Sequence, residues 1–514
     1  MKRREFLSYT ALGAAAYTLS NGANVLGLST AEAASRSRTP FSEQWLQTHA
    51  LKLAKRKYQK PSTKLPDNYK KMSYIEYRDI RFNPAKSIWK DTNSPFQLQM
   101  FHNGFLYKHD VDVHLIERQS AKQLKYSTSM FTFGKHVKPP KPVSKAGFSG
   151  FRIHTAINSK KILDEFCLFQ GASYFRAVAA GQAYGLSARG LAINTGQPAG
   201  EEFPIFRSFW IETPTRNATS ITIYALLDTE SVVGIYRFVI TPGNKTVMDV
   251  KSTLYPRKKM DYVGIGPLTS MFMHGPGSRR RFDDFRPRVH DSEGLCIQNG
   301  KDEIIWRPLV NPKSLQFSSF MDENPKGFGL VQRTRKFTDY QDLEADYEQR
   351  PSLWVKPQGD WGRGQVHLIE IPTSQEIHDN IVAFWKPEQP LKPGQIYQYD
   401  YSLIWGRGPE VNTDKAYIEH TRQGKGFDTD KRQFVLDYKL PTGAPLQLEE
   451  NMKAEVTANG GVISDIVLQS NDEDGGVRLN FKYDPQNVKY ADLRSTIKQN
   501  GKTISEVWVY RWET

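Results

Sequence analysis

Short runs of β-branched and aromatic residues, with few helical periods between them, most constrain how this chain can fold. Residues 221–227 (Ile-Thr-Ile-Tyr-Ala-Leu-Leu) and 232–240 are typical, and a Thr-Pro-Gly-Asn turn signal follows them. Similar runs occupy residues 96–106, 304–309, 366–371, 396–404, 434–440 and 507–512. Strands that follow one another without intervening helices favour packed antiparallel sheets over a parallel α/β sheet. The sequence therefore predicts an all-β fold of sandwich architecture.

The 514 residues are enough for two or three domains, and stretches without strand signals divide them. Residues 41–57 precede the strands and are predicted to form an amphipathic helix. Residues 135–147 are rich in Pro and Lys, and residues 406–426 are polar and Gly-rich, so both are expected to be loops. After the second loop, residues 427–514 are long enough for one small Ig-like sandwich of about 7 strands.

The first 33 residues have the pattern of an export signal. Arg3 and Arg4 precede Phe-Leu, a weakly apolar stretch follows, and Ala31-Glu32-Ala33 matches a cleavage site. The paired arginines indicate the twin-arginine route. Gly and Asn dilute the apolar stretch, and no later run is long enough to span a membrane. We therefore expect a periplasmic protein that is soluble after cleavage near Ala33.

The formal net charge is +15, but the basic residues are distributed among acidic ones. The only tight basic run, Arg279 to Arg281, is followed at once by Asp283 and Asp284. Nucleic-acid recognition needs a basic stripe on one face, so we expect no nucleic-acid partner. A basic surface also suits an anionic membrane or an acidic polymer, and the sequence leaves this choice open, together with the formation of a homodimer.

Metal and redox chemistry find little support in the sequence. Asp110, Asp112 and His114 alternate along a predicted strand, but Val111 and Val113 between them indicate a half-buried strand with a solvent-facing polar side. Walker loops, dinucleotide fingerprints and zinc-protease motifs are absent. We therefore expect neither a metal nor a cofactor.

The chain has two cysteines, Cys167 and Cys296. No Cys-x-x-Cys pair exists, so neither a zinc ribbon nor a thioredoxin motif is present. In an oxidising compartment the two thiols can form one disulfide, but the sequence does not tell whether their Cα atoms lie close enough.

Two aspartates have a sequence context that suits acid–base chemistry. Asp291 lies in His-Asp-Ser after the arginine-rich segment, and Asp379 precedes Ile-Val-Ala-Phe-Trp, a strand with the composition of a buried core. Glycoside hydrolysis needs one carboxylic acid to protonate the leaving oxygen and one carboxylate to activate water. Taken alone, each aspartate is more often a turn residue or a structural hydrogen-bond acceptor than a catalytic group.

Eight ordered segments carry a resemblance to a known family. They are Phe169–Val178, Tyr184–Ile193, Glu201–Pro204, Asn324–Leu330, Tyr340–Asp342, Arg350–Val355, Gly362–Gly364 and Glu370–Pro372. From about residue 40 to the C-terminus the chain resembles the osmoregulated periplasmic glucan biosynthesis proteins G and D, and its leader resembles the D type. The resemblance implies a large galactose-mutarotase-like β-sandwich in residues 34–406, a linker in residues 407–426 and an Ig-like domain in residues 427–514.

The resemblance also implies a chemistry. Members of this family are similar to inverting endo-β-1,2-glucanases, in which Asp379 would be the general acid and Asp291 the general base. Some relatives resemble transglycosylases that close the glucan into a ring. A third interpretation is a non-catalytic factor that binds β-1,2-glucan and hands nascent chains to a membrane glucan synthase. His378 precedes the acid where the family usually has Leu, and the loop after Trp405 differs, so the choice between hydrolysis and transglycosylation stays open.

Binding roles follow from the same resemblance. Tyrosine and tryptophan rings are expected to stack on glucose, and charged side chains are expected to bind its hydroxyl groups. The residues with these expected roles are Tyr174, Tyr347, Trp354 and Trp361 for stacking, and Arg176, Arg189 and Glu370 for hydrogen bonding.

Overall fold

The computed structural model describes residues 39–61, 65–140, 146–278, 282–426 and 431–514. The predicted export signal and the basic run at residues 279–281 lie outside the described residues. Strands dominate the rest and its helices are short, so the all-β prediction is confirmed. No described helix has the length and apolar character that crossing a membrane would require.

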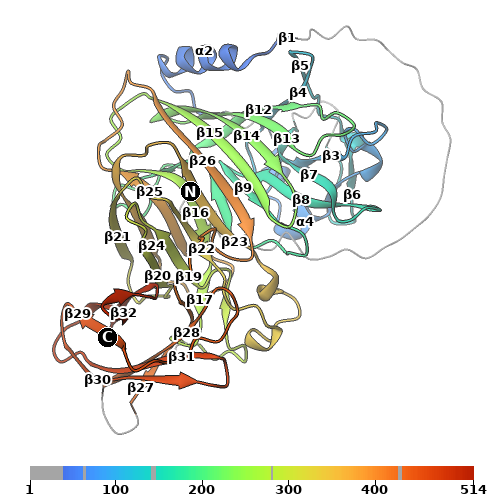
Figure 1. The fold of residues 1–514 in the computed structure, drawn as a ribbon. Helices are drawn as coiled ribbons and strands as arrows, with labels where there is room; N and C mark the ends of the chain where they lie inside the picture. The colour runs from blue at the N-terminus through green and yellow to red at the C-terminus, as the bar shows by residue number, and fades with distance from the viewer. Residues whose placement is uncertain (1–38, 62–64, 141–145, 279–281, 427–430) are drawn as a thin grey trace.

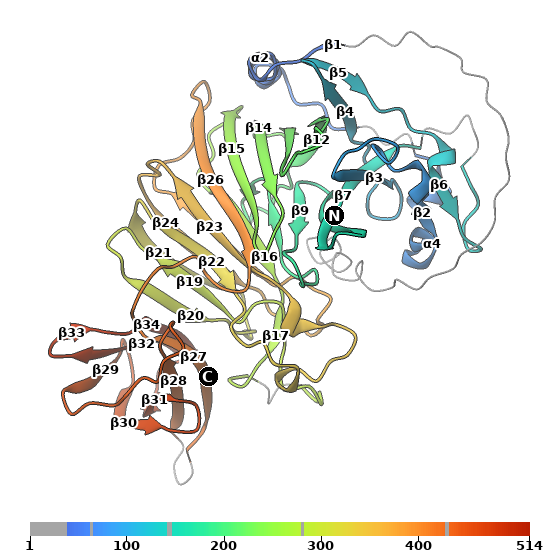
Figure 2. The same cartoon turned by 45° about the vertical axis from the view of Figure 1, so that its right-hand side comes forward.

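Two large sheets form most of the molecule (Figures 1 and 2). The first has sixteen strands, in the order β1 (Thr39–Pro40), β5 (Ser120–Gln123), β4 (Asp112–Glu117), β12 (Ile205–Glu212), β13 (Ile221–Asp228), β14 (Val232–Thr241), β15 (Thr246–Pro256), β26 (Tyr397–Gly406), β23 (Ser352–Gln358), β22 (Gly327–Val331), β19 (Gly294–Gln298), β20 (Ile304–Pro308), β34 (Val507–Glu513), β32 (Tyr490–Gln499) and β29 (Met452–Ala458), with β33 (Lys502–Thr503) beside β32. The second has ten strands, in the order β21 (Gln316–Glu323), β24 (Arg363–Glu370), β25 (Ile381–Pro387), β16 (Val263–Ser270), β10 (Ser187–Arg189), β9 (Tyr174–Ala177), β8 (Ile162–Gln170), β7 (Phe148–Ser159) and β3 (Phe96–His102), with β11 (Ala192–Ile193) beside β16.

Smaller elements complete the fold. Two-stranded sheets join β17 (Phe272–His274) to β18 (Val289–His290) and β2 (Ile80–Phe82) to β6 (Phe131–Phe133). The α-helices are α2 (Glu43–Ala54), α3 (Asp67–Lys70) and α4 (Tyr74–Arg78), and short 3-10 helices cover Pro84–Lys86, Thr128–Met130, Phe337–Asp339 and Tyr347–Gln349.

Aromatic side chains from both large sheets meet in the main core. Phe169 and Phe175, on neighbouring strands of the ten-stranded sheet, stack with ring centroids 5.1 Å apart. Phe209 and Phe238, from the sixteen-stranded sheet, meet Phe169 edge to face at 5.6 and 5.3 Å. These contacts are the preferred geometries of aromatic pairs and explain why Phe recurs at alternate positions of the predicted strands.

The helix predicted at residues 41–57 is present as α2 and covers the outer face of the sixteen-stranded sheet (Figure 1). Ser42 caps it, because its Oγ accepts a hydrogen bond from the Trp45 N–H at 3.1 Å. Leu46 and Ala50 are buried in a cluster with Val233 and Ile235 of β14. The alternation along β14 therefore buries both of its faces, one in the core and one under α2.

The C-terminal strands form a lobe at one end of the molecule, which joins the sixteen-stranded sheet through β34 (Figure 2). β34 runs parallel to β20, with Trp508 opposite Trp306. A four-stranded sheet packs beside them, in the order β27 (Tyr417–Lys425), β28 (Arg432–Lys439), β31 (Gly476–Asp484) and β30 (Val462–Asn471). Arg333 stabilises the contact between β20 and the C-terminal strands. Its guanidinium lies 3.6 Å over the Trp306 ring and pairs with Glu506 at 2.7 Å.

Residues 407–426, which the sequence predicts to be a linker, differ from that expectation. Strand β27 occupies residues 417–425 and pairs with β28 along its length. Only Ile418 of this strand is buried, because the other side chains lie partly in solvent at a sheet edge. An edge strand of this kind needs no apolar alternation, so its polar, Gly-containing sequence has the composition of a loop.

Trp508 is expected to be a large contributor to the stability of the C-terminal sheets. Its side chain is fully buried and packs edge to face against Phe434 and Phe481 at 5.7 and 5.9 Å. Trp508→Ala should therefore lower the free energy of unfolding by about 3–5 kcal/mol, measured by urea denaturation. Val467→Ala, at a side chain that is 48% exposed, is the matched control and should change it by less than about 1 kcal/mol. Equal losses in the two variants would contradict this packing.

Candidate active site

Asp291 and Asp379, the aspartate pair, reach one short segment of the chain from two sides. Asp291 directly follows β18, and its backbone N–H donates to the carbonyl of Met271 at 2.8 Å. Asp379 precedes β25, whose first residue, Ile381, pairs with Ser270 at the end of β16. Backbone hydrogen bonding therefore brings both aspartates close to Met271 in space.

Asn380, directly after Asp379, holds this arrangement in place. Its Oδ1 accepts a hydrogen bond from the Phe272 N–H at 2.8 Å. Its Nδ2 donates to the carbonyls of Phe272 and Ile371 at 3.0 Å each. Sequence reasoning did not single out Asn380, although its position beside Asp379 is a signal that could have found it.

Each aspartate is buried and faces one arginine. Asp291 is 2% exposed and forms an ion pair with the Nη1 of Arg350. Asp379 is 3% exposed, and its Oδ2 lies 3.8 Å from the Nη2 of Arg176 on β9. The Nε of Arg176 donates to Ser187 Oγ at 2.6 Å, which fixes the direction of the guanidinium. Buried carboxylates need such partners because an unpaired buried charge is costly.

Arg350 lies in one of the segments that resemble the family, although sequence reasoning gave it no role. In the structure its side chain is held in a fixed position by several contacts. Its Nε and Nη2 donate to the carbonyl of Ala345 at 3.0 and 2.9 Å. Its guanidinium lies 4.3 Å over the ring of Tyr347. Burial is the largest single influence and lowers the pKa of Arg350, but Asp291, Tyr347 and Glu376 together outweigh it, so the pKa is raised. The guanidinium therefore stays charged.

Arg286 connects three loops around the aspartate pair. It forms ion pairs with Asp284 at 2.8 Å, Asp342 at 2.6 Å and Glu376 at 2.7 Å. Its hydrogen bond to Asp284 is the largest of the effects that raise the pKa of Arg286. Glu376 also accepts a hydrogen bond from the Tyr347 hydroxyl at 3.3 Å. Arg286 thus connects the loop that leads to Asp379 with the loops that precede Asp291 and Tyr347.

An open cavity of about 400 Å³ lies beside the loop that leads to Asp379. Its lining residues are Met273, Arg286, Gln375, Glu376 and Ile377. His378, the departure from the usual family residue, lies with its Nδ1 3.1 Å from Thr373 Oγ1 in the same loop. A sugar in this cavity would meet charged side chains on one side and the segment leading to Asp379 on the other.

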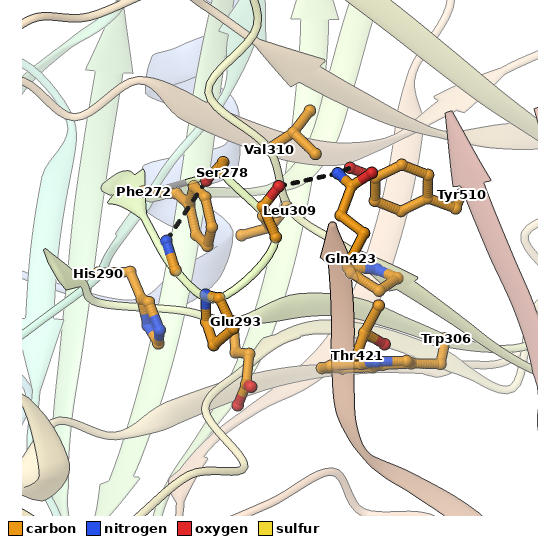
Figure 3. Close-up of a pocket in the computed structure, with 14 residues that line it drawn as sticks. Phe272, Ser278, His290, Glu293, Trp306, Leu309, Val310, Thr421, Gln423 and Tyr510 are labelled. Atoms are coloured by element: carbon orange, nitrogen blue, oxygen red, sulfur yellow. Dashed lines mark hydrogen bonds between the residues drawn. The ribbon is translucent and has the colours of Figure 1, made fainter. Parts of the chain in front are cut away.

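A second and smaller cavity, of about 40 Å³, lies behind Phe272 (Figure 3). His290 stacks on Phe272 with ring centroids 5.3 Å apart, and burial lowers the pKa of His290 to about 4, so its imidazole is neutral at pH 7. Gln423, from β27, donates to the Gly277 carbonyl at 2.8 Å and to the Tyr510 hydroxyl at 2.7 Å. The C-terminal strands therefore support the back of the segment that carries the aspartate pair.

Two predicted hydrogen-bonding residues have structural partners of their own. Arg189 is 2% exposed and donates to Glu201 at 2.7 Å and to the hydroxyl of Tyr174 at 3.3 Å. Glu370 is fully buried and accepts from Arg307 at 3.0 Å, and burial is the largest of the influences that leave its pKa raised. Of the three charged residues expected to bind hydroxyl groups, Arg176 alone contacts the aspartate pair in the described contacts.

Most of the predicted stacking rings are core residues, which corrects that expectation. Tyr174 is 4% exposed, Trp354 is 1% exposed and Trp361 is 5% exposed. Trp361 donates its Nε1–H to the Asp400 carbonyl at 3.2 Å, and Trp354 packs over the glycines of β22. Tyr347 is buried as well, but it adjoins the site through Arg350.

The described residues contain no group of three His, Cys, Asp or Glu side chains placed to hold a metal ion. Asp112 and His114 lie on β4, and Asp110, before that strand, accepts a hydrogen bond from Asn103. Cys167 and Cys296 are buried and free, so the disulfide that the sequence left open is not formed in this structure.

Comparisons with known proteins identify relatives along nearly the whole chain. The family model described as "Periplasmic glucan biosynthesis protein, MdoG" matches residues 41–512. The chain is 50% identical over 466 residues to glucans biosynthesis protein G of Vibrio cholerae, which covers 90% of this chain and 85% of the relative. It is 47% identical over the same length to glucans biosynthesis protein G of Shewanella sp. strain ANA-3, with the same coverage.

Two solved structures align with about half of this chain, and their likeness to it is weak. A galactose mutarotase related enzyme from Lactobacillus acidophilus aligns with 52% of this chain and 97% of its own, at 11% identity and a TM-score of 0.21. An alpha-galactosidase from Geobacillus stearothermophilus aligns with 51% of this chain and 40% of its own, at 8% identity and a TM-score of 0.24. These TM-scores are too low to assign a fold. The sequence matches suffice for the assignment: the chain belongs to the MdoG family of periplasmic glucan biosynthesis proteins.

Proposed function

We propose that this protein cleaves a β-1,2-linked glucan backbone with inversion, with Asp379 as general acid and Asp291 as general base. One observation carries the proposal: two buried aspartates from distant parts of the chain flank Met271, and each faces one arginine. The open cavity lined by residues 375–377 supplies space for a sugar next to the loop that leads to Asp379. Periplasmic glucan biosynthesis, the role that names the family, supplies the class of substrate.

In this mechanism the proton of Asp379 moves to the glycosidic oxygen as the bond between that oxygen and the anomeric carbon breaks. Water attacks the anomeric carbon from the opposite face and gives its proton to Asp291, directly or through a substrate hydroxyl. The ion pair with Arg350 suits Asp291 to the role of base, because an ionised carboxylate only accepts hydrogen bonds. Arg176 lies 3.8 Å from Asp379 and can hold this carboxyl in position for proton transfer.

Transglycosylation on the same aspartate pair is the second candidate. It replaces water by a hydroxyl of the glucan itself, and a ring closes when that hydroxyl belongs to the same chain. Biosynthesis in the names of the relatives favours it over degradation. The third candidate is a non-catalytic assembly factor that binds glucan and hands nascent chains to a membrane synthase. The leader suggests the D type of the family.

Replacement of either aspartate is expected to abolish turnover. Asp379→Asn and Asp291→Asn should each reduce product formation from linear β-1,2-glucan by about 10²–10⁴-fold, because each variant loses one proton-transfer group. Chromatography and mass spectrometry of the products separate shortened chains from rings. Asp261→Asn, at a carboxylate that is 69% exposed, is the matched control and should keep full activity.

Three results would change the proposal. Undiminished turnover in Asp379→Asn would remove that residue as the acid. Ring products would establish transglycosylation in place of hydrolysis. Tight glucan binding without any product from the unaltered protein would establish the assembly factor.

Arg286 is expected to matter for activity although it is not a proton-transfer group. Arg286→Gln removes the cation that joins Asp284, Asp342 and Glu376, so the loop that leads to Asp379 should lose its fixed position. We expect kcat to fall by about 10-fold or more, while the melting temperature stays close to that of the unaltered protein. Arg363→Gln, at a side chain that is 66% exposed, is the control. Unchanged kcat in Arg286→Gln would contradict the positioning role.

Export by the twin-arginine route is the finer part of the proposed location. Arg3 and Arg4 are the residues on which that route depends. The double variant Arg3→Lys/Arg4→Lys should therefore keep the precursor in the cytoplasm, which cell fractionation and immunoblotting measure. Normal periplasmic recovery of the variant would indicate a different export route.

A further inference from the structure

The side of α2 that faces away from β14 combines exposed apolar side chains with basic ones. Trp45 is 40% exposed and Leu51 is 39% exposed. Lys52 follows Trp45 by seven residues, and Lys55 follows Leu51 by four. Residues with these spacings share one side of a helix, so the exposed apolar and basic side chains lie together.

Basic residues gather at the C-terminal end of α2 and just beyond it, whereas residues 44–66 contain no Asp or Glu. The exposed basic side chains of the described part of this segment are Lys52, Lys55, Arg56, Lys57 and Lys60. None of them forms an ion pair with the described residues. Residues 55–57 are a tight basic run that sequence reasoning overlooked. Together with Trp45 and Leu51, we call these basic residues the α2 face.

Charges around the α2 face are paired or lie at the other end of the helix. The loop after β15 adjoins the end of α2, where Arg257 donates to the carbonyl of Arg56 at 3.3 Å. The next two residues of this loop, both lysines, pair with Glu230 and Asp261 at 3.1 and 2.6 Å. Glu43 lies in the first turn of α2. The uncompensated positive charge is therefore confined to the second half of α2 and the segment after it.

Two histidines respond to this positive charge. Burial lowers the pKa of His49 most, and the charges of Arg56 and Lys52 lower it further. Burial also lowers the pKa of His109, and the further causes are cations, Lys60 among them. Nearby positive charges disfavour a protonated imidazole, so both ends of the basic segment carry a positive potential.

The chemistry of the α2 face fits the surface of an anionic lipid bilayer. Lysine and arginine near such a surface are attracted by the negatively charged head groups. Tryptophan favours the boundary between head groups and acyl chains, because its ring is apolar and its N–H is polar. A soluble acidic polymer would need only the charges, whereas Trp45 and Leu51 add apolar surface that the boundary of a bilayer accommodates.

We propose that the α2 face docks on the anionic surface of a membrane and holds this chain there as a peripheral protein. The inference goes beyond the proposed function and does not depend on it. α2 lies at the end of the molecule away from the C-terminal lobe (Figures 1 and 2). The segment that leads to Asp291 contacts that lobe, since Gln423 donates to the Gly277 carbonyl. Docking through α2 therefore leaves the candidate site open to substrate.

Vesicle sedimentation tests the docking with protein recovered from the periplasm. Vesicles of phosphatidylethanolamine and phosphatidylglycerol in about a 3:1 ratio are compared with vesicles of phosphatidylcholine alone. The triple variant Lys52→Gln/Lys55→Gln/Arg56→Gln should lower the partition coefficient for the anionic vesicles by about 30- to 100-fold, because each basic residue near the surface contributes a severalfold gain. Added salt should weaken the binding of the unaltered protein.

The matched control removes the same charge from the C-terminal lobe. It is the triple variant Lys453→Gln/Lys489→Gln/Lys502→Gln, at three exposed lysines. Its partition coefficient should stay within about threefold of that of the unaltered protein, because these charges lie more than a screening length from a membrane at α2. Near-ultraviolet circular dichroism and the melting temperature verify that both triple variants are folded.

Several results would overturn the docking. They are no binding of the unaltered protein, equal binding to anionic and neutral vesicles, unchanged binding of the α2 variant, and equal losses in both triple variants. Sedimentation velocity addresses a second copy of this chain as the occupant of the α2 face. A dimer that the α2 variant converts to monomers would assign the face to self-association instead. None of these results bears on the aspartate pair, because turnover is measured on soluble glucan.

Discussion

The pairing of β16 with β25 is the constraint on which the candidate site depends. It sets Ser270 opposite Ile381, and one residue later the chain leaves the sheet and binds the backbone of Asp291. Because strand register changes only in whole residues, a slip by one would turn the side chains of β25 to the opposite face. Asn380 opposes such a slip, since its amide is satisfied by two backbone carbonyls and one N–H only in this register. The aspartate pair is therefore a consequence of sheet geometry.

Buried negative charges in this structure are compensated by positively charged side chains. Several buried carboxylates each face an arginine that is itself largely buried, among them Asp291 with Arg350, Asp379 with Arg176, Glu370 with Arg307, Glu201 with Arg189 and Glu506 with Arg333. Removing one partner of such a pair leaves an uncompensated buried charge, so these pairs define one packing arrangement of the strands. The pair with Arg350 lies next to residues around an open cavity.

Much of the fold could be predicted from the sequence, because apolar alternation reports which face of a strand is buried. The runs at residues 221–227 and 232–240 are strands β13 and β14, and the helix expected at residues 41–57 is α2. The segment 407–426 was misjudged, because β27 contributes only Ile418 to the core. Trp354 and Trp361 were expected to bind sugar, but composition alone does not distinguish a ring in a groove from a ring in a core.

The sequence by itself determined the strand-rich architecture and, through its long similar segments, the family and the two aspartates worth testing. Only the tertiary structure decided which arginine faces each aspartate, that Asn380 and Arg286 hold the surrounding loops, and which aromatic rings remain exposed. The reason is physical. Hydrophobic periodicity is a local property that neighbouring residues reveal, whereas the partner of a buried charge comes from a distant segment and is set by sheet register and loop packing.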